Sequence, residues 1–443
     1  MKKILIETYG CQMNKADSEL VAGVMMPEGY EPTETHSEAD VILLNTCAVR
    51  EGAEDRILGI LAQYRKYKEN RPGTVLGVIG CMAQNLKEKL VQQRPWVDLV
   101  VGPDAYRDLP KIISDLHKPQ HEPAVIVRRD RFENYEEIFP VRGEGINAWV
   151  SIMRGCDNFC TFCIVPHTRG RERSRKLASI VREVEDAAEK GYVEITLLGQ
   201  NVNSWRDEDT NERFAELLTA VGKVHGVKRV RFTSPHPKDF PDPLLYAMAA
   251  NPTVLVPHIH LPLQSGNSHV LERMNRGYTK EEYLHLVYHI RSIIPDIAFT
   301  TDIIVGFPGE TAEQFLDTLD VIRQVRYSGA FMFKYSQRPY TKAASWADDV
   351  TEGEKQERLQ TLIDLQRTIE SDVVAEWVGT ETEILIEGPS PKRREEWIGR
   401  TPQNRPVVVT GNGELPGDLI AVKLTGRRAM TLVGETISAQ LAA

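Results

Sequence analysis

The sequence predicts an α/β protein in three parts: an N-terminal parallel α/β domain, a central partial barrel of six βα units, and a small C-terminal antiparallel β-barrel. Three observations lead to this prediction. The chain has 443 residues, which is more than one ordinary hydrophobic core accommodates. Short apolar runs alternate with helical patterns in two separate stretches. From about Gly379 the pattern changes to short strands separated by Gly and Pro.

The first stretch, residues 1–120, indicates one small α/β domain. Parallel strands need crossover connections, which are usually helices, and apolar runs and helical segments alternate here in that way. The expected strands are Ile4–Glu7, Val41–Asn45, Val75–Ile79 and Leu99–Val101, and the expected helices are Ser18–Met26, Glu51–Glu69 and Leu86–Gln93.

Residues 121–148 are rich in Pro, Glu and Arg without clear periodicity, and are expected to form a linker. The alternation then resumes over residues 149–375, and a final helix over 352–377 closes the unit. Six βα units indicate an incomplete barrel, whose chemistry should lie at the carboxyl ends of its strands. The expected strands are Trp149–Met153, Val193–Leu198, Val227–Phe232, Val256–Leu261, Ala298–Val305 and Gly329–Tyr335.

Residues 376–443 are expected to form a small antiparallel β-barrel. Barrels of this kind often bind oligonucleotides. The expected strands are Glu383–Glu387, Trp397–Thr401, Pro406–Thr410, Leu419–Thr425 and Leu432–Ile437.

Composition and charge limit the classes of protein to consider. No apolar run approaches the roughly 18 residues of a membrane span, and Glu7 interrupts the apolar N-terminus, so a cytoplasmic location is expected. The formal net charge of −9 taken alone argues against a nucleic-acid partner. The acidic excess is thinly spread, however, and basic residues concentrate after Cys163 and in the C-terminal part, which leaves RNA open.

Three of the six cysteines, Cys156, Cys160 and Cys163, follow the first expected barrel strand with Cys-x3-Cys-x2-Cys spacing. Three thiolates on a tight loop can hold three irons of a 4Fe-4S cluster and leave the fourth iron open for a small ligand. The alternative is a zinc site, which His167 would complete as a Cys3His set.

The other three cysteines, Cys11, Cys47 and Cys81, are far apart in sequence, but each directly follows an expected strand. Residues beyond the carboxyl ends of neighbouring parallel strands converge on one crevice. We therefore expect these thiols to meet and to hold a second three-ligand cluster. The alternative is that they are inert buried residues.

Motifs along essentially the whole chain resemble those of the radical methylthiotransferases. Among the subfamilies, the sequence is most similar to the tRNA enzymes that act on N6-isopentenyladenosine beside the anticodon. One departure is Gln337–Thr341, where that subfamily usually has Gly before the Thr. The motifs are Tyr9-Gly10-Cys11-Gln12-Met13-Asn14, Asn45-Thr46-Cys47, Gly80-Cys81-Met82-Ala83, Arg154–Cys163, Leu198–Ser204, Thr233–Pro237, His260–Gly266 and Thr301–Glu310, together with a TRAM-like C-terminal module.

The resemblance implies insertion of sulfur and a methyl group at carbon 2 of the adenine at tRNA position 37. It implies two 4Fe-4S clusters, on Cys156/Cys160/Cys163 and on Cys11/Cys47/Cys81, and two molecules of S-adenosylmethionine per turnover, as radical source and as methyl donor. The implied partners are the tRNA anticodon stem-loop, an electron donor such as flavodoxin or ferredoxin and a sulfur source, with the chain a monomer. Alternatives are the same chemistry on a ribosomal protein residue or on N6-threonylcarbamoyladenosine of tRNA, and a non-catalytic zinc RNA-binding protein.

Further residues at the expected top of the barrel are candidates for contacts with the cofactor or RNA. A turn or a solvated charged loop is the simpler interpretation of each of these segments. The candidates for S-adenosylmethionine are Gln200, Asn201, Ser234, Gln264, Gly306 and Glu310. The candidates for RNA phosphates are Arg169, Arg171, Arg173 and Arg175 after the cysteine loop, and Lys392, Arg393 and Arg394 in the C-terminal domain.

Overall fold

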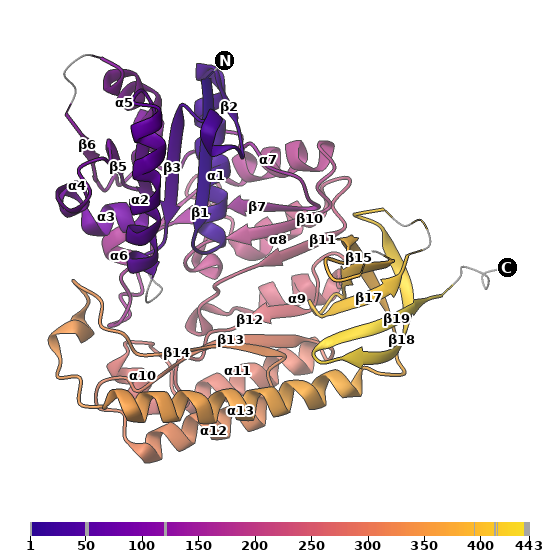
Figure 1. Ribbon diagram of the computed structural model, residues 1–443. Helices are drawn as coiled ribbons and strands as arrows, with labels where there is room; N and C mark the ends of the chain where they lie inside the picture. Colours follow the sequence, from indigo (N-terminus) through magenta and orange to yellow (C-terminus); the bar gives the residue numbers. More distant parts are fainter. Residues whose placement is uncertain are drawn as a thin grey trace.

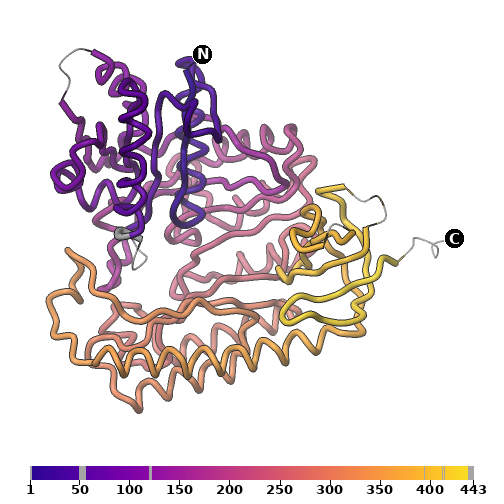
Figure 2. The backbone as a smooth tube through the Cα atoms, in the orientation of Figure 1, coloured from indigo at the N-terminus to yellow at the C-terminus, as the bar shows by residue number. Residues whose placement is uncertain are grey.

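The structure, a computed structural model, describes residues 2–48, 53–118, 122–393, 395–411, 413 and 415–437. An N-terminal α/β domain and a C-terminal β-barrel both pack on a central domain and lie at different ends of it (Figure 1; Figure 2). The predicted fold class is therefore confirmed. No helix in the described ranges is long and apolar enough to cross a membrane.

The N-terminal domain is a parallel six-stranded sheet in the order β2-β1-β3-β4-β5-β6. Its central strands, β3 and β4, are buried at every residue, as expected for a parallel sheet with helices on both faces. The strands are β1 Lys2–Tyr9, β2 Tyr30–Pro32, β3 Val41–Thr46, β4 Val75–Gly80, β5 Leu99–Val101 and β6 Ala124–Ile126, and the helices are α1 Gln12–Met25, α2 Ala53–Asn70, α3 Cys81–Leu86, α4 Glu88–Gln93 and α5 Leu109–Leu116.

Helices α3 and α5 were not expected from the sequence, and three further elements also differ from the prediction. The edge strands β2 and β6 were not expected, and β6 lies inside the segment predicted as linker, so the sheet continues to Ile126. Helix α1 begins directly after Cys11 rather than at Ser18. Strand β2 contains Glu31 and Pro32 and so lacks an apolar run, and β6 lies in a segment whose Pro, Glu and Arg content indicated a linker.

The central domain is an open barrel built from two parallel three-stranded sheets, β7-β10-β11 and β12-β13-β14. A single parallel bridge between Val230 and Leu255 joins the sheets, so β7 and β14 form the two edges of the barrel. The strands are β7 Asn147–Ser151, β10 Glu194–Leu198, β11 Arg229–Phe232, β12 His258–His260, β13 Ala298–Val305 and β14 Gly329–Lys334. The helices are α6 Val165–Thr168, α7 Leu177–Glu189, α8 Phe214–Gly222, α9 Asp242–Ala250, α10 Ser268–Arg273, α11 Lys280–Ile293, α12 Ala312–Val325 and α13 Glu352–Glu376, and a hairpin of β8 Met153–Arg154 and β9 Arg173–Ser174 follows β7.

The C-terminal domain is a closed five-stranded barrel, β15-β16-β17-β19-β18. It packs against the amino ends of the central strands, where Lys228, Arg229 and Arg231 donate hydrogen bonds to its backbone carbonyls. Because the expected chemistry lies at the carboxyl ends, this domain sits at the opposite end of the barrel from the cysteines. Its strands are β15 Glu381–Pro389, β16 Glu396–Arg400, β17 Pro406–Thr410, β18 Leu419–Arg428 and β19 Thr431–Thr436.

Candidate metal-cluster site between two domains

The loop that carries Cys156, Cys160 and Cys163 leaves the barrel through the short β8–β9 hairpin. The amide of Cys156 donates to the carbonyl of Gly170 (3.1 Å), and Gly155 has a positive φ of 76°. A Cβ at Gly155 would collide with the carbonyl oxygen of Arg171, so only glycine fits at this close approach. The far end of the loop is fixed by Thr161, whose amide and hydroxyl donate to backbone carbonyls at the end of α10.

A buried arginine from the same domain contacts this first cysteine set. The guanidinium of Arg276 donates to the sulfur of Cys160 (3.2 Å) and to the carbonyl of Pro262 (3.2 Å). Burial raises the pKa of the Cys156 thiol to about 11 and that of Cys163 to about 12. Without a positively charged ligand these thiols would therefore stay protonated, and metal binding would have to displace their protons.

The second set, Cys11, Cys47 and Cys81, is assembled by the parallel sheet. Strands β1, β3 and β4 are adjacent; Cys47 and Cys81 directly follow β3 and β4, and Cys11 lies two residues beyond the end of β1. The Cys11 and Cys47 side chains are hydrogen-bonded, which together with the charge of Arg169 lowers the pKa of the Cys11 thiol to about 5 despite its burial. A thiolate is the form of cysteine that binds iron.

Two asparagines hold the strand ends of this second set together. Asn14 Nδ2 donates to Asn45 Oδ1 (2.9 Å), and Asn45 Nδ2 donates back to the Asn14 carbonyl (2.8 Å). Gly80, with a φ of 92°, lies against the Asn45 side chain, and a Cβ there would collide with it. The asparagines are buried and belong to the Tyr9–Asn14 and Asn45–Cys47 motifs, but the sequence did not indicate that they contact each other.

The two cysteine sets face each other across the domain boundary. Cys81 packs with Ala48 and Ile164 in one buried apolar cluster, and Ile164 directly follows Cys163. Cys11 packs against the small buried cluster of Met13, Ala16 and Leu198, and Leu198 is the last residue of barrel strand β10. The N-terminal domain therefore places its three thiols over the carboxyl ends of the barrel strands.

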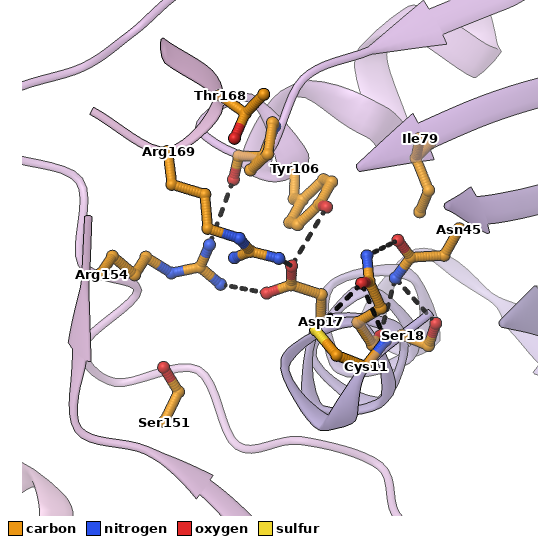
Figure 3. A network of polar contacts seen from close by, with 12 residues as sticks. Cys11, Asp17, Ser18, Asn45, Ile79, Tyr106, Ser151, Arg154, Thr168 and Arg169 are labelled. Carbon is orange, nitrogen blue, oxygen red and sulfur yellow. Dashed lines mark hydrogen bonds and ion pairs between the residues drawn. The ribbon is translucent and has the colours of Figure 1, made fainter. Parts of the chain in front are cut away.

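A buried ion-pair network joins the domains beside Cys11 (Figure 3). Asp17 on α1 accepts hydrogen bonds from Arg154 (2.5 Å) and from Arg169 (2.7 Å), both of the central domain. The two guanidinium groups hold the pKa of the Asp17 carboxyl below its usual value, although burial opposes them. The sequence prediction missed Asp17, because this residue lies before the expected start of the helix. Its spacing from Met13 and Leu20 places it on the apolar face of α1, which is a signal that the sequence contains.

The structure contradicts the predicted RNA contact for three of the four arginines after the cysteine loop. Arg169 binds Asp17, Arg173 makes a two-pronged ion pair with Asp104 (2.9 and 3.0 Å), and Arg175 is paired with a buried glutamate. These three residues are at most 9% exposed. Arg171 alone is exposed, and it pairs with Asp157. Arg169 and Arg173 therefore bind the two domains together, since Asp17 and Asp104 belong to the N-terminal domain.

The candidate cofactor residues fall into two groups. Asn201 donates to Asp239 (3.0 Å), and Glu310 is held by the Gly306 amide and by Arg358 (2.9 Å), so these side chains are already engaged by the protein. By contrast, Gln200 and Gln264 each have a buried side-chain oxygen with no hydrogen-bond partner among the described residues. Gln264 and Ser234 also have positive φ values, 69° and 59°. Unpaired buried oxygens at strand ends suit a polar ligand at this position.

The basic residues of the C-terminal domain lie between β15 and β16. Lys392 and Arg393 are exposed, and Arg393 is 3.4 Å from Glu396. Arg394, also predicted to bind RNA, lies outside the described residues. The exposed pair remains a candidate for contact with phosphates.

The donor chemistry of both cysteine sets fits iron–sulfur clusters. In the part of the chain that the structure describes, no three His, Cys, Asp or Glu side chains are arranged to bind a single metal ion. This arrangement does not favour the zinc alternative, and His167 is instead exposed with its ring 6.0 Å from that of Tyr340. In a cubane cluster each thiolate binds a different iron, so the sulfurs need not converge on one point.

Comparison with known proteins agrees with this geometry. Residues 3–102 match the uncharacterized protein family UPF0004, residues 150–322 the Radical SAM superfamily, and residues 376–437 the TRAM domain. A tRNA-2-methylthio-N(6)-dimethylallyladenosine synthase from Porphyromonas gingivalis is 47% identical over 98% of this chain and 95% of its own length. The chain belongs to this synthase family. Members from Chloroherpeton thalassium and from a Thermoanaerobacter species are each 46% identical, over 98% of this chain and 96% and 92% of their own lengths.

Membership of the synthase family makes the chain a methylthiotransferase of the radical SAM superfamily, as the motifs predicted. Solved structures share its fold. The radical S-adenosylmethionine methyltransferase TsrM from Kitasatospora setae, solved with cobalamin and a [4Fe-4S] cluster, has a TM-score of 0.58 at 16% identity, over 78% of this chain and 77% of that one. OxsB, a cobalamin-dependent radical enzyme, has a TM-score of 0.53 at 14% identity, over 84% of this chain and 56% of that one.

Proposed function

We propose that this chain inserts sulfur and a methyl group at carbon 2 of N6-isopentenyladenosine at tRNA position 37, next to the anticodon. The observation that carries the proposal is the meeting of two three-cysteine sets, from two domains, at one buried boundary above the barrel. One cluster site alone would suffice to bind and cleave S-adenosylmethionine. Two facing sites suit a reaction that needs a radical and a sulfur atom at the same base.

The six cysteine thiolates would hold two 4Fe-4S clusters, with Cys156, Cys160 and Cys163 at one and Cys11, Cys47 and Cys81 at the other. When bound, the clusters and S-adenosylmethionine supply the electron, the radical and the sulfur, which no side chain can provide. The chain's own residues bind and orient the clusters and S-adenosylmethionine. Gln200 and Gln264 have side-chain oxygens available to accept hydrogen bonds from the amino group of S-adenosylmethionine, and the packed domain boundary excludes water.

The RNA would bridge the two ends of the barrel. The TRAM domain lies at the amino ends of the strands and the cysteines at the carboxyl ends, so a stem-loop held by the TRAM domain must pass along the barrel to reach the clusters. Edge strand β14 presents Phe331 and Phe333, which are 58% and 43% exposed, on the side shared with Asp302 and Ile304 of β13. Exposed aromatic rings are the usual platforms for unstacked RNA bases.

The proposal includes partners that match this chemistry. A one-electron donor such as flavodoxin or ferredoxin must reduce the first cluster, and a sulfur source must replenish the second. The protein would work in the cytoplasm. It would act as a monomer, because each chain carries both cysteine sets.

The proposal is tested by two measurements, one on the purified protein and one on a deletion strain. After anaerobic purification and reconstitution, iron and sulfide analysis should give about eight irons per chain. Mass analysis of nucleosides should show that a deletion strain lacks the methylthio derivative, and that the wild-type gene restores it. Ribosomal peptides should keep their masses. An unchanged methylthioadenosine level in the deletion strain would overturn the proposal, whereas an altered ribosomal peptide would favour the ribosomal-protein alternative.

A further inference from the structure

The network around Asp17 holds more positive than negative charge. Two arginines, Arg154 and Arg169, share the single carboxylate of Asp17, and all three side chains are at most 4% exposed. The neighbouring Tyr106 and Tyr135 are neutral, because burial raises the pKa of each hydroxyl. One buried positive charge is therefore not balanced by a carboxylate. Leaving such a charge uncompensated is costly, which indicates that an anion completes the site.

The two arginines differ in how their nitrogens are used. Arg154 donates to Asp17 and also approaches the carbonyl of Pro103 (3.5 Å), with its guanidinium over the ring of Tyr135 (4.4 Å). Arg169 donates to Asp17 through Nη2, while its Nη1 is buried and has no hydrogen-bond partner among the described residues. Arg169 is therefore the member of the pair with an N–H group left for another acceptor.

The acidic groups that remain beside Arg169 are the thiols of the second cysteine set. Cys81 packs in one buried cluster with Ile164, which directly precedes helix α6, and Arg169 directly follows that helix. Asp17 itself lies on helix α1, which begins directly after Cys11. The same helix thus positions one thiol and, through Asp17, the arginine that faces it.

We propose that Arg169 is the counter-cation of the cluster held by Cys11, Cys47 and Cys81, and that its Nη1 donates a hydrogen bond to a sulfur atom of that cluster. This inference rests on the proposed function, because it assumes a cluster at this site. A cubane core held by three thiolates carries a net negative charge, which matches the uncompensated arginine. Net charge and hydrogen bonds to sulfur set cluster potentials, so Arg169 would make this cluster easier to reduce.

The arrangement also makes Arg169 a positioning residue between the two sites. It lies on the segment that leaves the first cysteine loop, and its amide ends helix α6 by donating to the Val165 carbonyl (2.7 Å). The second cluster therefore receives its counter-charge from the central domain rather than from the domain that supplies its cysteines. The second site is electrostatically complete only when the two domains are docked.

The test uses the full chain with the first site removed, as the Cys156→Ala/Cys160→Ala/Cys163→Ala variant, reconstituted anaerobically with iron and sulfide. Iron content is measured, and the midpoint potential of the remaining cluster is followed by electron paramagnetic resonance during titration with dithionite. Arg169→Met is compared with Arg173→Met, a control that removes another buried arginine, which is paired with Asp104 across the same boundary and whose contact with Arg169 is to its backbone carbonyl. Arg169→Lys tests rescue by charge.

We expect Arg169→Met to shift the midpoint potential to more negative values, Arg173→Met to leave it unchanged, and Arg169→Lys to restore part of the shift. Equal potentials for Arg169→Met and Arg173→Met would overturn the inference. If Arg169→Met does not fold, Asp17→Asn provides the second arm: it removes a negative charge, so the potential should move in the positive direction, and a negative shift or none would contradict the inference. Absence of iron in the parent variant would instead count against the proposed function.

Discussion

The two cysteine sites of this chain are built by opposite means. The first comes from one short loop, Cys156 to Cys163, which leaves a hairpin and is held by backbone hydrogen bonds. The second comes from three strand ends between Cys11 and Cys81, held by Asn14 of helix α1 and Asn45 of strand β3, which hydrogen-bond to each other. The first site is therefore specified by local sequence, whereas the second exists only once the sheet has formed.

The arginines beside the two sites repeat this difference. Arg276 comes from the same domain as its cysteines and is fixed by Pro262 and by Tyr278 (3.0 Å). Arg169 reaches the second site from the neighbouring domain and is fixed by Asp17. The first site is therefore self-contained within the barrel, whereas the second depends on how the two domains dock.

Substitution of one cysteine in each site should separate the two sites by their chemistry. Cys156→Ala should abolish reductive cleavage of S-adenosylmethionine, because the first site loses a cluster ligand. Cys81→Ala should spare that cleavage and lose only sulfur insertion. Chromatography of 5′-deoxyadenosine and of tRNA nucleosides measures both. Equal loss of cleavage in two correctly folded variants would break the proposed division of roles.

The next prediction concerns the docking on which the second site depends. Asp17→Ala leaves two buried arginines without their carboxylate and should destabilise the docked domains by about 3–5 kcal/mol. Urea denaturation of the metal-free protein measures the change. Arg171→Ala is the control: this arginine is exposed, and its loss should not change the denaturation midpoint. Similar midpoints for the two variants would show that the network does not carry the docking.

A pH dependence should appear at the same domain boundary. Glu19 on α1 lies 3.7 Å from Arg142, yet burial, the dominant influence, raises its pKa from 4.5 to about 7. The folded state thus binds this proton more tightly than the unfolded state. The resulting stabilisation is complete below pH 4.5 and is lost as the pH rises through about 7. Glu19→Gln should flatten this part of the profile of unfolding midpoint against pH, and an unchanged profile would contradict the assignment.

A substitution of Arg276, with a smaller expected effect, tests whether the first site is self-contained. Arg276→Gln removes the hydrogen bond to the Cys160 sulfur but leaves the domain boundary intact. In a Cys11→Ala/Cys47→Ala/Cys81→Ala background, it should lower iron retention at the first site by a modest factor, which colorimetric iron analysis after gel filtration measures. The unfolding midpoint of the metal-free protein is the control. A fall in that midpoint like that of Asp17→Ala would show that Arg276 supports docking instead.

Most of the fold could be predicted because its signals are local. Every expected strand lies within a few residues of an observed one, since apolar runs such as Val41–Asn45 are bounded by turns and followed by helical segments. The edge strands β2 and β6 were not predicted, because β2 contains Glu31 and Pro32 and β6 lies in a segment whose composition indicated a linker. The start of α1 was missed because the segment from Gln12 to Asp17 is mostly polar.

The site was predictable only where spacing or strand order carries the information. The Cys156–Cys163 spacing is local, and the positions of Cys11, Cys47 and Cys81 follow from parallel topology. The burial of Arg169, Arg173 and Arg175 could not be predicted in this way. Two of their carboxylate partners, Asp17 and Asp104, come from another domain, and a run of charges has the same sequence whether solvent or protein surrounds it.

The attachment of the C-terminal barrel has a consequence for how this protein can change over time. Arg229 and Arg231 donate hydrogen bonds to the main-chain carbonyl oxygens of Arg400, Thr401 and Pro402. Every amino acid offers the same carbonyl, so substitutions on the surface of the TRAM domain leave these bonds in place. The side chains of this domain that we propose to contact RNA can therefore change while the domain stays anchored to the barrel.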